Sequence, residues 1–173
     1  MSSPALSPIS HDAFVADVKA LAALLAADHW RPDYLIGVGR GGLVPAAYLS
    51  HASGVTLLSV DYSSQEFSFA DELLHKLAAK TVAGQKLLIV DDINDSGKTI
   101  TELRRVIARE GGVPDNVRVA VLMNNIRSDA VADYWATQID RNSDKRWFVF
   151  PWEAMAPTDV IVEDAEAVPE RLA

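Results

Sequence analysis

The feature that most constrains how this chain can fold is the uninterrupted apolar run Leu87-Leu88-Ile89-Val90. A strand whose residues are all apolar must be covered on both faces, as the strands of parallel sheets are. Acidic residues and a Ser-Gly-Lys-Thr turn follow this run, and residues 99–110 then have a helical pattern that ends at a glycine pair. The sequence therefore predicts a buried parallel strand that leads through a polar turn into a helix.

Short apolar runs and helical patterns alternate along most of the chain. One expected helix starts at Ser10, a suitable N-cap, and ends near His29, just before an Arg-Pro pair. The expected strands cover residues 34–38, 55–60, 87–90 and 117–123, and the further expected helices cover residues 43–52, 70–79 and 99–110. Pro45 is tolerable only in the first turn of its helix. This alternation predicts an α/β fold with a mainly parallel sheet flanked by helices.

Length and charge predict one domain with an acidic end. The chain has 173 residues, of which 49% are hydrophobic, and this is the size and composition of a single globular domain. We expect that domain to cover residues 1–156, with a smaller, looser part around residues 130–156. Residues 157–173 contribute −4 to the net charge of −8. We expect them to form an acidic tail that is a solvated face or a partner contact.

Composition excludes several classes of function. The absence of cysteine rules out disulfides, thiolate nucleophiles and cysteine-bound zinc, and the four histidines are too scattered to predict a structural metal. The longest strongly apolar stretch, residues 20–27, is far too short to cross a bilayer. Without a recognisable signal peptide, we expect a cytoplasmic protein that does not contact membranes. The acidic net charge disfavours binding to nucleic acid.

The polar turn after residue 90 combines the groups that recognise a phosphorylated sugar. Asp91 and Asp92 end the expected strand, where their carboxylates can bind a sugar diol or hydrated Mg²⁺. Asp95 adds a third carboxylate just before a helix whose first backbone N–H groups can bind a phosphate. The phosphate-binding groups that we expect beside Asp95 belong to Ser96, Gly97, Lys98 and Thr99. The alternative, a merely acidic helix cap, accounts for one carboxylate better than for three.

Two other nucleotide-binding motifs compete with this interpretation. Residues 97–99, Gly-Lys-Thr, look like the end of a P-loop, but that motif requires a glycine where Asp92 stands. Residues 37–42 match the G-x-G-x-x-G of dinucleotide-binding folds, and Asp61 follows at a suitable distance. A helix before the strand and the presence of Arg40 within the loop argue against that match. Because the motif itself is matched, a nicotinamide-dependent enzyme is kept as an alternative.

With both loops considered together, the sequence resembles the type I phosphoribosyltransferases. Residues 88–99 are similar to the phosphoribosyl-pyrophosphate motif of that family: an apolar strand, paired acids, a third acid and a Ser-Gly-x-Thr turn. Residues 39–45, Gly-Arg-Gly-Gly-Leu-Val-Pro, resemble the pyrophosphate loop of its xanthine-guanine branch. Residues 147–153, Trp-Phe-Val-Phe-Pro-Trp-Glu, resemble the hood over the base in the same branch. The three matches occur in the order found in the family and cover residues 35–153.

The resemblance implies the family's fold, with a small C-terminal hood, and its reaction. That reaction transfers phosphoribosyl from 5-phosphoribosyl 1-pyrophosphate to a purine base, here a 6-oxopurine such as guanine, xanthine or hypoxanthine, and releases pyrophosphate. Asp91 and Asp92 would act as catalytic residues on the ribose hydroxyls and on the cofactor Mg²⁺, partly through water. Asp95 would manage the proton at purine N7, and Arg40 and Gly41 would hold the departing pyrophosphate. The resemblance also implies a homo-oligomer.

The expected base-binding residues are Trp147, Phe148 and Asn124. Trp147 would stack on the base, and backbone carbonyls around Phe148 could recognise its edge, whereas Trp152 is expected only to pack. The purine branch usually places a lysine after the strand at 117–123, where it binds the exocyclic oxygen of the base. This chain has Asn124 and Asn125 there, and an amide can donate to an oxygen or accept from an amino group, so the preferred base stays open.

A protein of the same fold that senses phosphoribosyl pyrophosphate without catalysis is the main alternative to an enzyme. Such a sensor can lose the acid that faces N7, whereas this chain retains Asp95. The polar segment 62–67 is a candidate mobile lid.

Overall fold

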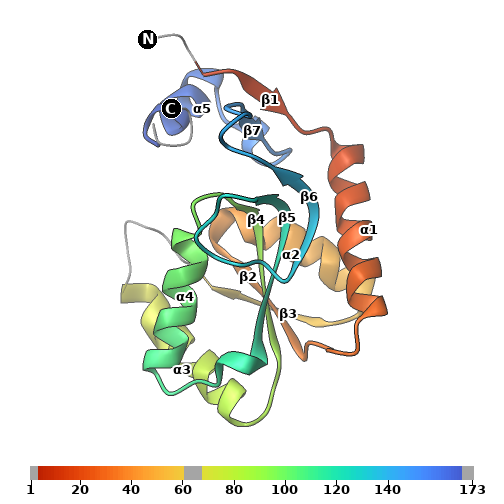
Figure 1. Cartoon of the computed structure of the whole chain (residues 1–173), viewed down its shortest axis with the longest axis vertical. Coiled ribbons are helices and arrows are strands. Elements are labelled where there is room, and N and C mark those ends of the chain that lie inside the picture. Colours follow the sequence, from red (N-terminus) through yellow and green to blue (C-terminus); the bar gives the residue numbers. More distant parts are fainter. Residues whose placement is uncertain (1–3, 61–67, 169–173) are drawn as a thin grey trace.

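The computed structural model describes residues 4–60 and 68–168, and within them five parallel strands form a central sheet in the order β3-β2-β4-β5-β6 (Figure 1). The strands are β2 (Tyr34–Val38), β3 (Thr56–Val60), β4 (Leu87–Asn94), β5 (Val117–Asn125) and β6 (Tyr134–Ile139). Each neighbouring pair is parallel. The predicted α/β fold with a parallel sheet is therefore confirmed.

Two layers of helices cover the two faces of the sheet. The helices α1 (His11–Ala27) and α2 (Gly39–Ser53) pack on one face, and α3 (Ser68–Val82) and α4 (Lys98–Arg109) pack on the other. The central strand β4 serves both cores, because Leu88 and Val90 join the first and Leu87 and Ile89 the second. This double burial explains why the run at 87–90 is entirely apolar.

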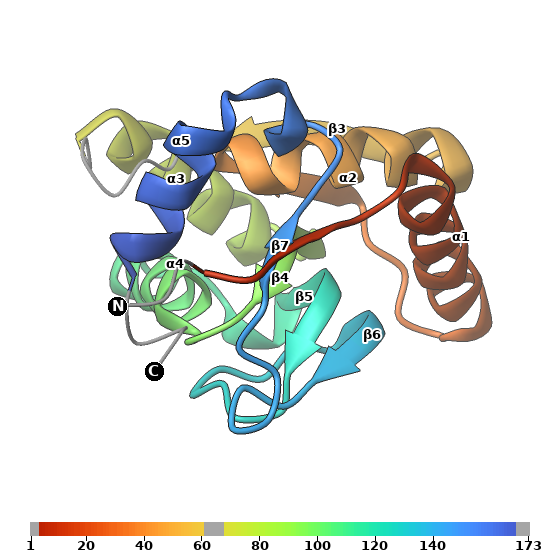
Figure 2. The same ribbon diagram turned by 90° about the horizontal axis from the view of Figure 1, so that it is seen from above.

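A small hood lies beyond the carboxyl ends of the sheet strands. It contains a two-stranded parallel sheet of β1 (Leu6–Pro8) and β7 (Trp147–Val149), in which Leu6 lies opposite Trp147. Figure 2 shows β1 beside β7, so the N-terminal segment takes part in a hood that the sequence predicts from residues 130–156 alone. The short turn η2 (Glu153–Met155) follows β7 in the hood, and the short turn η1 (Pro114–Asn116) connects α4 to β5.

The acidic segment after residue 157 is not only a solvated tail. It contains the helix α5 (Thr158–Glu166), in which Ile161 and Ala165 are buried. Its acidic side chains are exposed while these two apolar residues anchor it, as an amphipathic helix requires. The solvated face that we expected is therefore one side of a packed helix.

The observed elements differ from the expected ones in the fifth strand of the sheet and at the sheet's carboxyl edge. β6 lies within residues 130–156, which we expected to form only the hood, but it pairs with β5 in the central sheet. β4 continues beyond Val90 to Asn94, so Asp91 and Asp92 still belong to the strand. α2 begins at Gly39, which places Pro45 inside the helix rather than in its first turn, contrary to our expectation. Pro45 has no N–H to donate within the helix, and the burial of residues 46 and 49 holds the helix on the sheet instead.

The candidate lid at 62–67 lies outside the described residues. Within the part of the chain that is described, no helix is both long and apolar enough to span a membrane.

Candidate functional site

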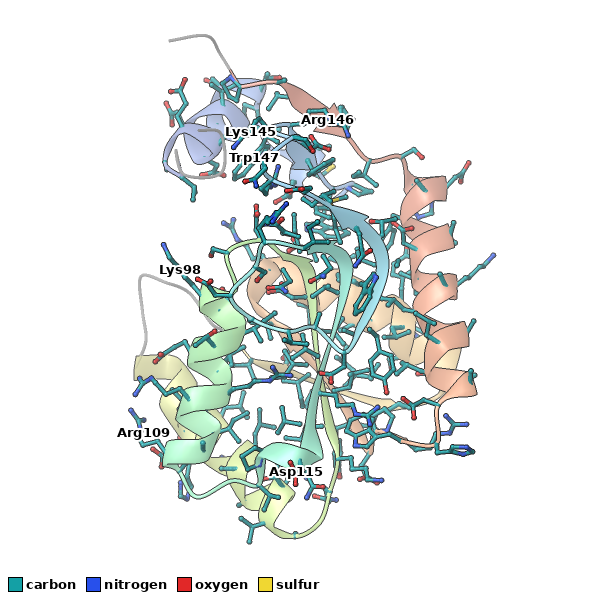
Figure 3. All side chains as sticks on the ribbon, viewed as in Figure 1. Lys98, Arg109, Asp115, Lys145, Arg146 and Trp147 are labelled. Carbon is teal, nitrogen blue, oxygen red and sulfur yellow. The ribbon has the colours of Figure 1, made fainter. Side chains whose placement is uncertain are left out.

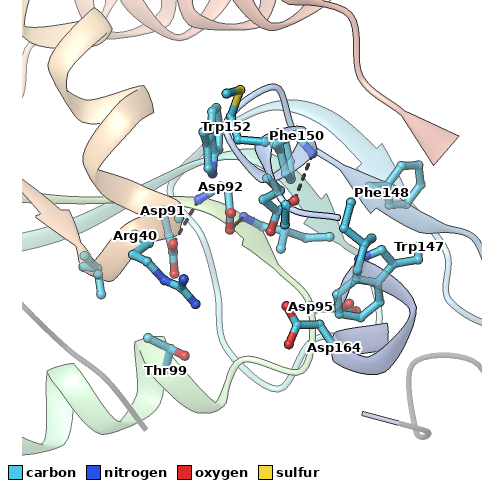
Figure 4. Close-up of a pocket in the computed structure, with 18 of the residues that line it drawn as sticks. Arg40, Asp91, Asp92, Asp95, Thr99, Trp147, Phe148, Phe150, Trp152 and Asp164 are labelled. Atoms are coloured by element: carbon cyan, nitrogen blue, oxygen red, sulfur yellow. Dashed lines mark hydrogen bonds between the residues drawn. The ribbon is translucent and has the colours of Figure 1, made fainter. Parts of the chain in front are cut away.

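A pocket of about 680 Å³ lies between the carboxyl edge of the sheet and the hood (Figure 4). The β2–α2 junction, the end of β4 and the start of α4 line one side, and β7, the residues after it and α5 line the other. The carboxyl ends of parallel strands are where ligands bind in α/β proteins. Of the expected site residues, those that line the pocket are Arg40, Gly41, Asp91, Asp92, Asp95, Thr99, Trp147 and Phe148.

The paired acids of β4 are held by the backbone around them. The Asp92 N–H donates to Asp91 Oδ1 at 3.0 Å, and the Ile93 N–H donates to Asp92 Oδ1 at 2.7 Å. Gly41 approaches Asp92 closely, because a Cβ atom on Gly41 would lie 2.5 Å from Asp92 Oδ2. A side chain at position 41 would therefore displace the Asp92 carboxylate where the first turn of α2 meets the acidic end of β4.

The start of α4 is oriented toward the same pocket. Its N-cap is Gly97, which has φ +84° and no side chain with which to cap the first backbone N–H groups. Thr99 in the first turn lines the pocket, while Ser96, Gly97 and Lys98 do not. Figure 3 shows Lys98 pointing outward from the start of α4, and its side chain is exposed. The first turn of α4 thus offers backbone N–H groups and the Thr99 hydroxyl to an anion.

A buried ion pair joins Asp95 and Arg141 in the wall of the pocket. Arg141 Nη2 donates to Asp95 Oδ2 at 2.8 Å, and Arg141 Nε donates to Oδ1 at 3.0 Å. The Arg141 and Asp95 side chains are only 9% and 4% exposed. A two-pronged contact of this kind is the most specific geometry available to an arginine and a carboxylate. Sequence analysis missed Arg141, because a single arginine between short strands has no spacing that marks it.

Asn125 forms hydrogen bonds to both members of this ion pair. Its Nδ2 donates to the backbone oxygen of Asp95 at 3.0 Å, and the Arg141 N–H donates to Asn125 Oδ1 at 3.2 Å. Asn125 is 5% exposed, so it connects the end of β5 to both members of the ion pair.

The expectation that Asn124 binds the base is contradicted by its position. Asn124 does not line the pocket, and its Oδ1 accepts from Asn94 Nδ2 at 2.8 Å. Because successive residues of a strand point to opposite faces, Asn124 faces away from Asp95 while Asn125 faces toward it. Asn124 therefore belongs to a structural network with Asn94 and Ser128, whose hydroxyl donates to Asn94 Oδ1 at 2.7 Å.

Aromatic side chains form the roof of the pocket. Trp147 is half-buried and lines the pocket beside Asp95 (Figure 4). Phe150 and Trp152 stack with ring centroids 5.0 Å apart, and Trp152 meets the edge of Phe14 of α1 at 5.3 Å. The expected packing of Trp152 is therefore present, but Trp152 also lines the pocket.

The loop that carries Arg141 is braced by two further arginine–aspartate pairs. Hydrogen bonds from Arg127 lower the pKa of Asp140, and hydrogen bonds from Arg146 lower the pKa of Asp144. Arg127 and Arg146 are more than half exposed, unlike Arg141. Both pairs fix the loop from its outer side and leave Arg141 as its buried member.

Comparison with known proteins gives the family context. The model of the phosphoribosyl transferase domain matches residues 9–157. The chain is 26% identical over 149 residues to a xanthine-guanine phosphoribosyltransferase of Gluconobacter oxydans (strain 621H), covering 84% of this chain and 83% of that one. Among solved structures, it is similar to a purine phosphoribosyltransferase from Pyrococcus horikoshii Ot3, with a TM-score of 0.61, 26% identity and coverage of 85% and 93%. It is also similar to a xanthine-guanine-hypoxanthine phosphoribosyltransferase from Helicobacter pylori, with a TM-score of 0.64, 21% identity and coverage of 92% and 97%.

Proposed function

Because this chain belongs to the phosphoribosyltransferase family, we propose that it transfers phosphoribosyl from 5-phosphoribosyl 1-pyrophosphate to a purine, with a 6-oxopurine as the acceptor. The observation that carries the proposal is the pocket itself. It combines a helix start with a glycine N-cap, paired carboxylates, an arginine and an aromatic roof in one cavity of about 680 Å³. These are the separate groups that a sugar phosphate, a pyrophosphate and a flat base require.

The sugar phosphate would lie along the end of β4 and the start of α4. The 5-phosphate would accept hydrogen bonds from the backbone of residues 95–99 and from the Thr99 hydroxyl. Asp91 and Asp92 would accept hydrogen bonds from the ribose hydroxyls, and Arg40 with the Gly41 backbone would bind the pyrophosphate. All of these residues except 96–98 line the pocket.

The carboxylates of Asp91 and Asp92 also fit Mg²⁺, which prefers oxygen ligands and retains several waters. Among the described residues, no group of three or more acidic or histidine side chains could hold a metal by itself. The remaining ligands would therefore come from water and from the substrate. When bound, Mg²⁺ would neutralise charge on the leaving pyrophosphate.

The chemical step breaks the bond between ribose C1 and the pyrophosphate oxygen and forms a bond from C1 to a base nitrogen. Arg40 would stabilise the charge that develops on the leaving group. Trp147 would stack on the face of the base. The Asp95 carboxylate would accept a hydrogen bond from the N–H at N7 and take that proton when the new bond to C1 leaves the base positively charged. The nucleophile and C1 are thereby held in line, which lowers the entropic part of the barrier.

The proposal is tested by measuring pyrophosphate release from phosphoribosyl pyrophosphate and Mg²⁺ with guanine, xanthine, hypoxanthine, adenine, uracil and orotate. We expect release with at least one of the three oxopurines and much slower release with the pyrimidines. Binding of phosphoribosyl pyrophosphate without release for any base would support the non-catalytic sensor instead. Thermal stabilisation by NAD would support the dinucleotide alternative.

The cytoplasmic location and the homo-oligomeric state stay predictions. Size-exclusion chromatography with light scattering would test the oligomeric state directly.

A further inference from the structure

We propose that Arg141 determines which base the site accepts, by donating a hydrogen bond to the exocyclic oxygen at C6 of a purine. This inference rests on the proposed function, and it assigns recognition of the oxygen to a residue of the β6–β7 loop rather than to the end of β5. It is carried by the position of Arg141 in the pocket wall and by its hydrogen bonds.

The first step concerns the donors of the guanidinium. An arginine has five N–H groups and no acceptor. Nε and one N–H of Nη2 bond to Asp95, and Nη1 donates to the carbonyls of Asp144 at 3.2 Å and Arg146 at 2.6 Å. One N–H of Nη2 therefore has no acceptor among the described residues. Arg141 is 8% exposed and lines the pocket, so a ligand in the pocket can supply the acceptor for that donor.

The second step concerns where this donor lies. Arg141 touches Asp95 on one side, and its guanidinium lies 5.2 Å from the ring centroid of Phe148 on the other. Phe148 and Trp147 both line the pocket, so the guanidinium lies near the Asp95 carboxylate and near an aromatic ring of β7, the strand that also carries Trp147. A base that places its N7–H toward Asp95 presents the substituent at C6 on the same edge, next to Arg141.

The third step concerns discrimination. An oxygen at C6 accepts from the guanidinium, whereas an amino group at C6 would face it donor to donor and leave both groups unpaired. Buried polar sites reject analogues that leave them unpaired far more strongly than apolar pockets do. Arg40 is the other basic residue in the described lining of the pocket, and it lies beside Asp91 and Thr99, away from Trp147 (Figure 4).

The test uses product nucleotides, so that it does not depend on turnover. Dissociation constants are measured by isothermal titration calorimetry for inosine monophosphate, adenosine monophosphate and purine riboside monophosphate, which has hydrogen at C6. We expect the wild-type protein to bind inosine monophosphate at least about tenfold more tightly than either analogue. In Arg141→Gln, the ratio of the dissociation constant of each analogue to that of inosine monophosphate should fall to within about threefold of unity. The main cause should be weaker binding of inosine monophosphate.

Arg127→Gln is the matched control. Arg127 makes the same two-pronged contact with Asp140, at 3.1 and 3.0 Å, on the outer side of the same loop. The Arg127→Gln substitution should leave the ratio of the dissociation constants unchanged, because Arg127 does not line the pocket. If Arg141 had a purely structural role, its substitution would weaken the binding of all three nucleotides equally and leave the ratio as in the wild type. That result would overturn the inference.

Two arms keep this test separate from that of the proposed function. If Arg141→Gln does not fold, the dissociation constants of the three nucleotides for the wild-type protein still test the inference. Equal dissociation constants for the three nucleotides overturn it. If the protein shows the expected ratios but releases no pyrophosphate with any base, the proposed reaction is wrong while the assignment of Arg141 stands.

Discussion

Asp95 is the residue on which the proposed chemistry depends most directly. It lies between the turn proposed to bind the phosphate and the roof proposed to bind the base, and Arg141 and Asn125 fix its orientation. A carboxylate held in this way is positioned before substrate arrives, so little of the binding energy is needed to orient it.

Asp95→Asn should reduce kcat by roughly 10²–10⁴-fold, the usual contribution of a positioned acid or base, and should leave the KM for phosphoribosyl pyrophosphate nearly unchanged. Steady-state kinetics with both substrates varied would measure this. Asp140→Asn, which breaks the Arg127 pair outside the pocket, is the control. A fall of less than about fivefold for Asp95→Asn would show that another group manages the proton.

Arg40→Ala should weaken product inhibition by pyrophosphate by about tenfold or more, because a charge-assisted hydrogen bond to the leaving group is lost. Inhibition constants at fixed Mg²⁺ would measure the effect. Arg109→Ala, at the far end of α4 (Figure 3), removes an arginine of the same charge and should change nothing. Equal inhibition in all three proteins would exclude Arg40 from the pyrophosphate site.

At the scale of single elements, the start of α4 depends on one glycine. A Cβ atom at Gly97 would lie 2.5 Å from the Ala130 backbone nitrogen and 2.7 Å from Ser128 Oγ. The close approach is thus to the β5–β6 connection and not to the pocket. Gly97 would serve the proposed phosphate site indirectly, by letting the helix begin against that connection.

Gly97→Ala should raise the KM for phosphoribosyl pyrophosphate and destabilise the fold by more than backbone strain alone. The strain of a positive φ is roughly 1–3 kcal/mol. Gly84→Ala isolates that strain, since Gly84 has φ +82° and no atom lies within 4 Å of the place that a Cβ atom would take. Chemical denaturation of both variants and of the wild type measures the difference. Equal free energies of unfolding for the two variants would show that the contact with Ala130 carries no cost.

The elements that the sequence predicts are those whose hydrophobic pattern follows from burial, on both faces for a central strand and on one face for a helix. The strand at 87–90 is predicted because all four residues are buried, and a helix such as α4 because its buried residues recur at helical spacing. The three-residue strands β1 and β7 have no such signal, because their pairing depends on contacts between opposite ends of the chain. Asn124 and Asn125 differ by one step along β5, and only the register of that strand decides which one meets Asp95.

At the scale of the whole molecule, Asp28 connects α1 to the sheet at the edge opposite the pocket. It accepts from the Trp30 N–H at 2.8 Å, from the Tyr134 hydroxyl at 2.7 Å and from Arg118 Nη1 at 2.7 Å. These hydrogen bonds, that of Trp30 first, hold the pKa of Asp28 far below its ordinary value.

Because the folded-state pKa of Asp28 is lowered, its contribution to stability is present above the unfolded-state pKa of about 3.9 and is lost as the pH falls below it. The wild type should therefore be more stable than Asp28→Asn at pH 7, and the gap should narrow steadily below about pH 4. Urea denaturation of both proteins between about pH 7 and pH 3 measures it. If the difference in the free energy of unfolding between the two proteins does not change with pH, the charge of Asp28 is not what stabilises the fold.

The pairing of Leu6 with Trp147 also predicts that β1 and β7 pair after the units of the central sheet have formed. Strands that close most of the chain into one loop must overcome a larger entropic cost than the neighbouring βα units of the sheet, which form from nearby segments. The acidic end of β4 and the start of α4 can therefore be complete while the roof is still open. Since β7 follows β4 and α4 along the chain and leaves the ribosome after them, we expect the half of the pocket assigned to the sugar phosphate to be assembled first, and the half assigned to the base to close over it.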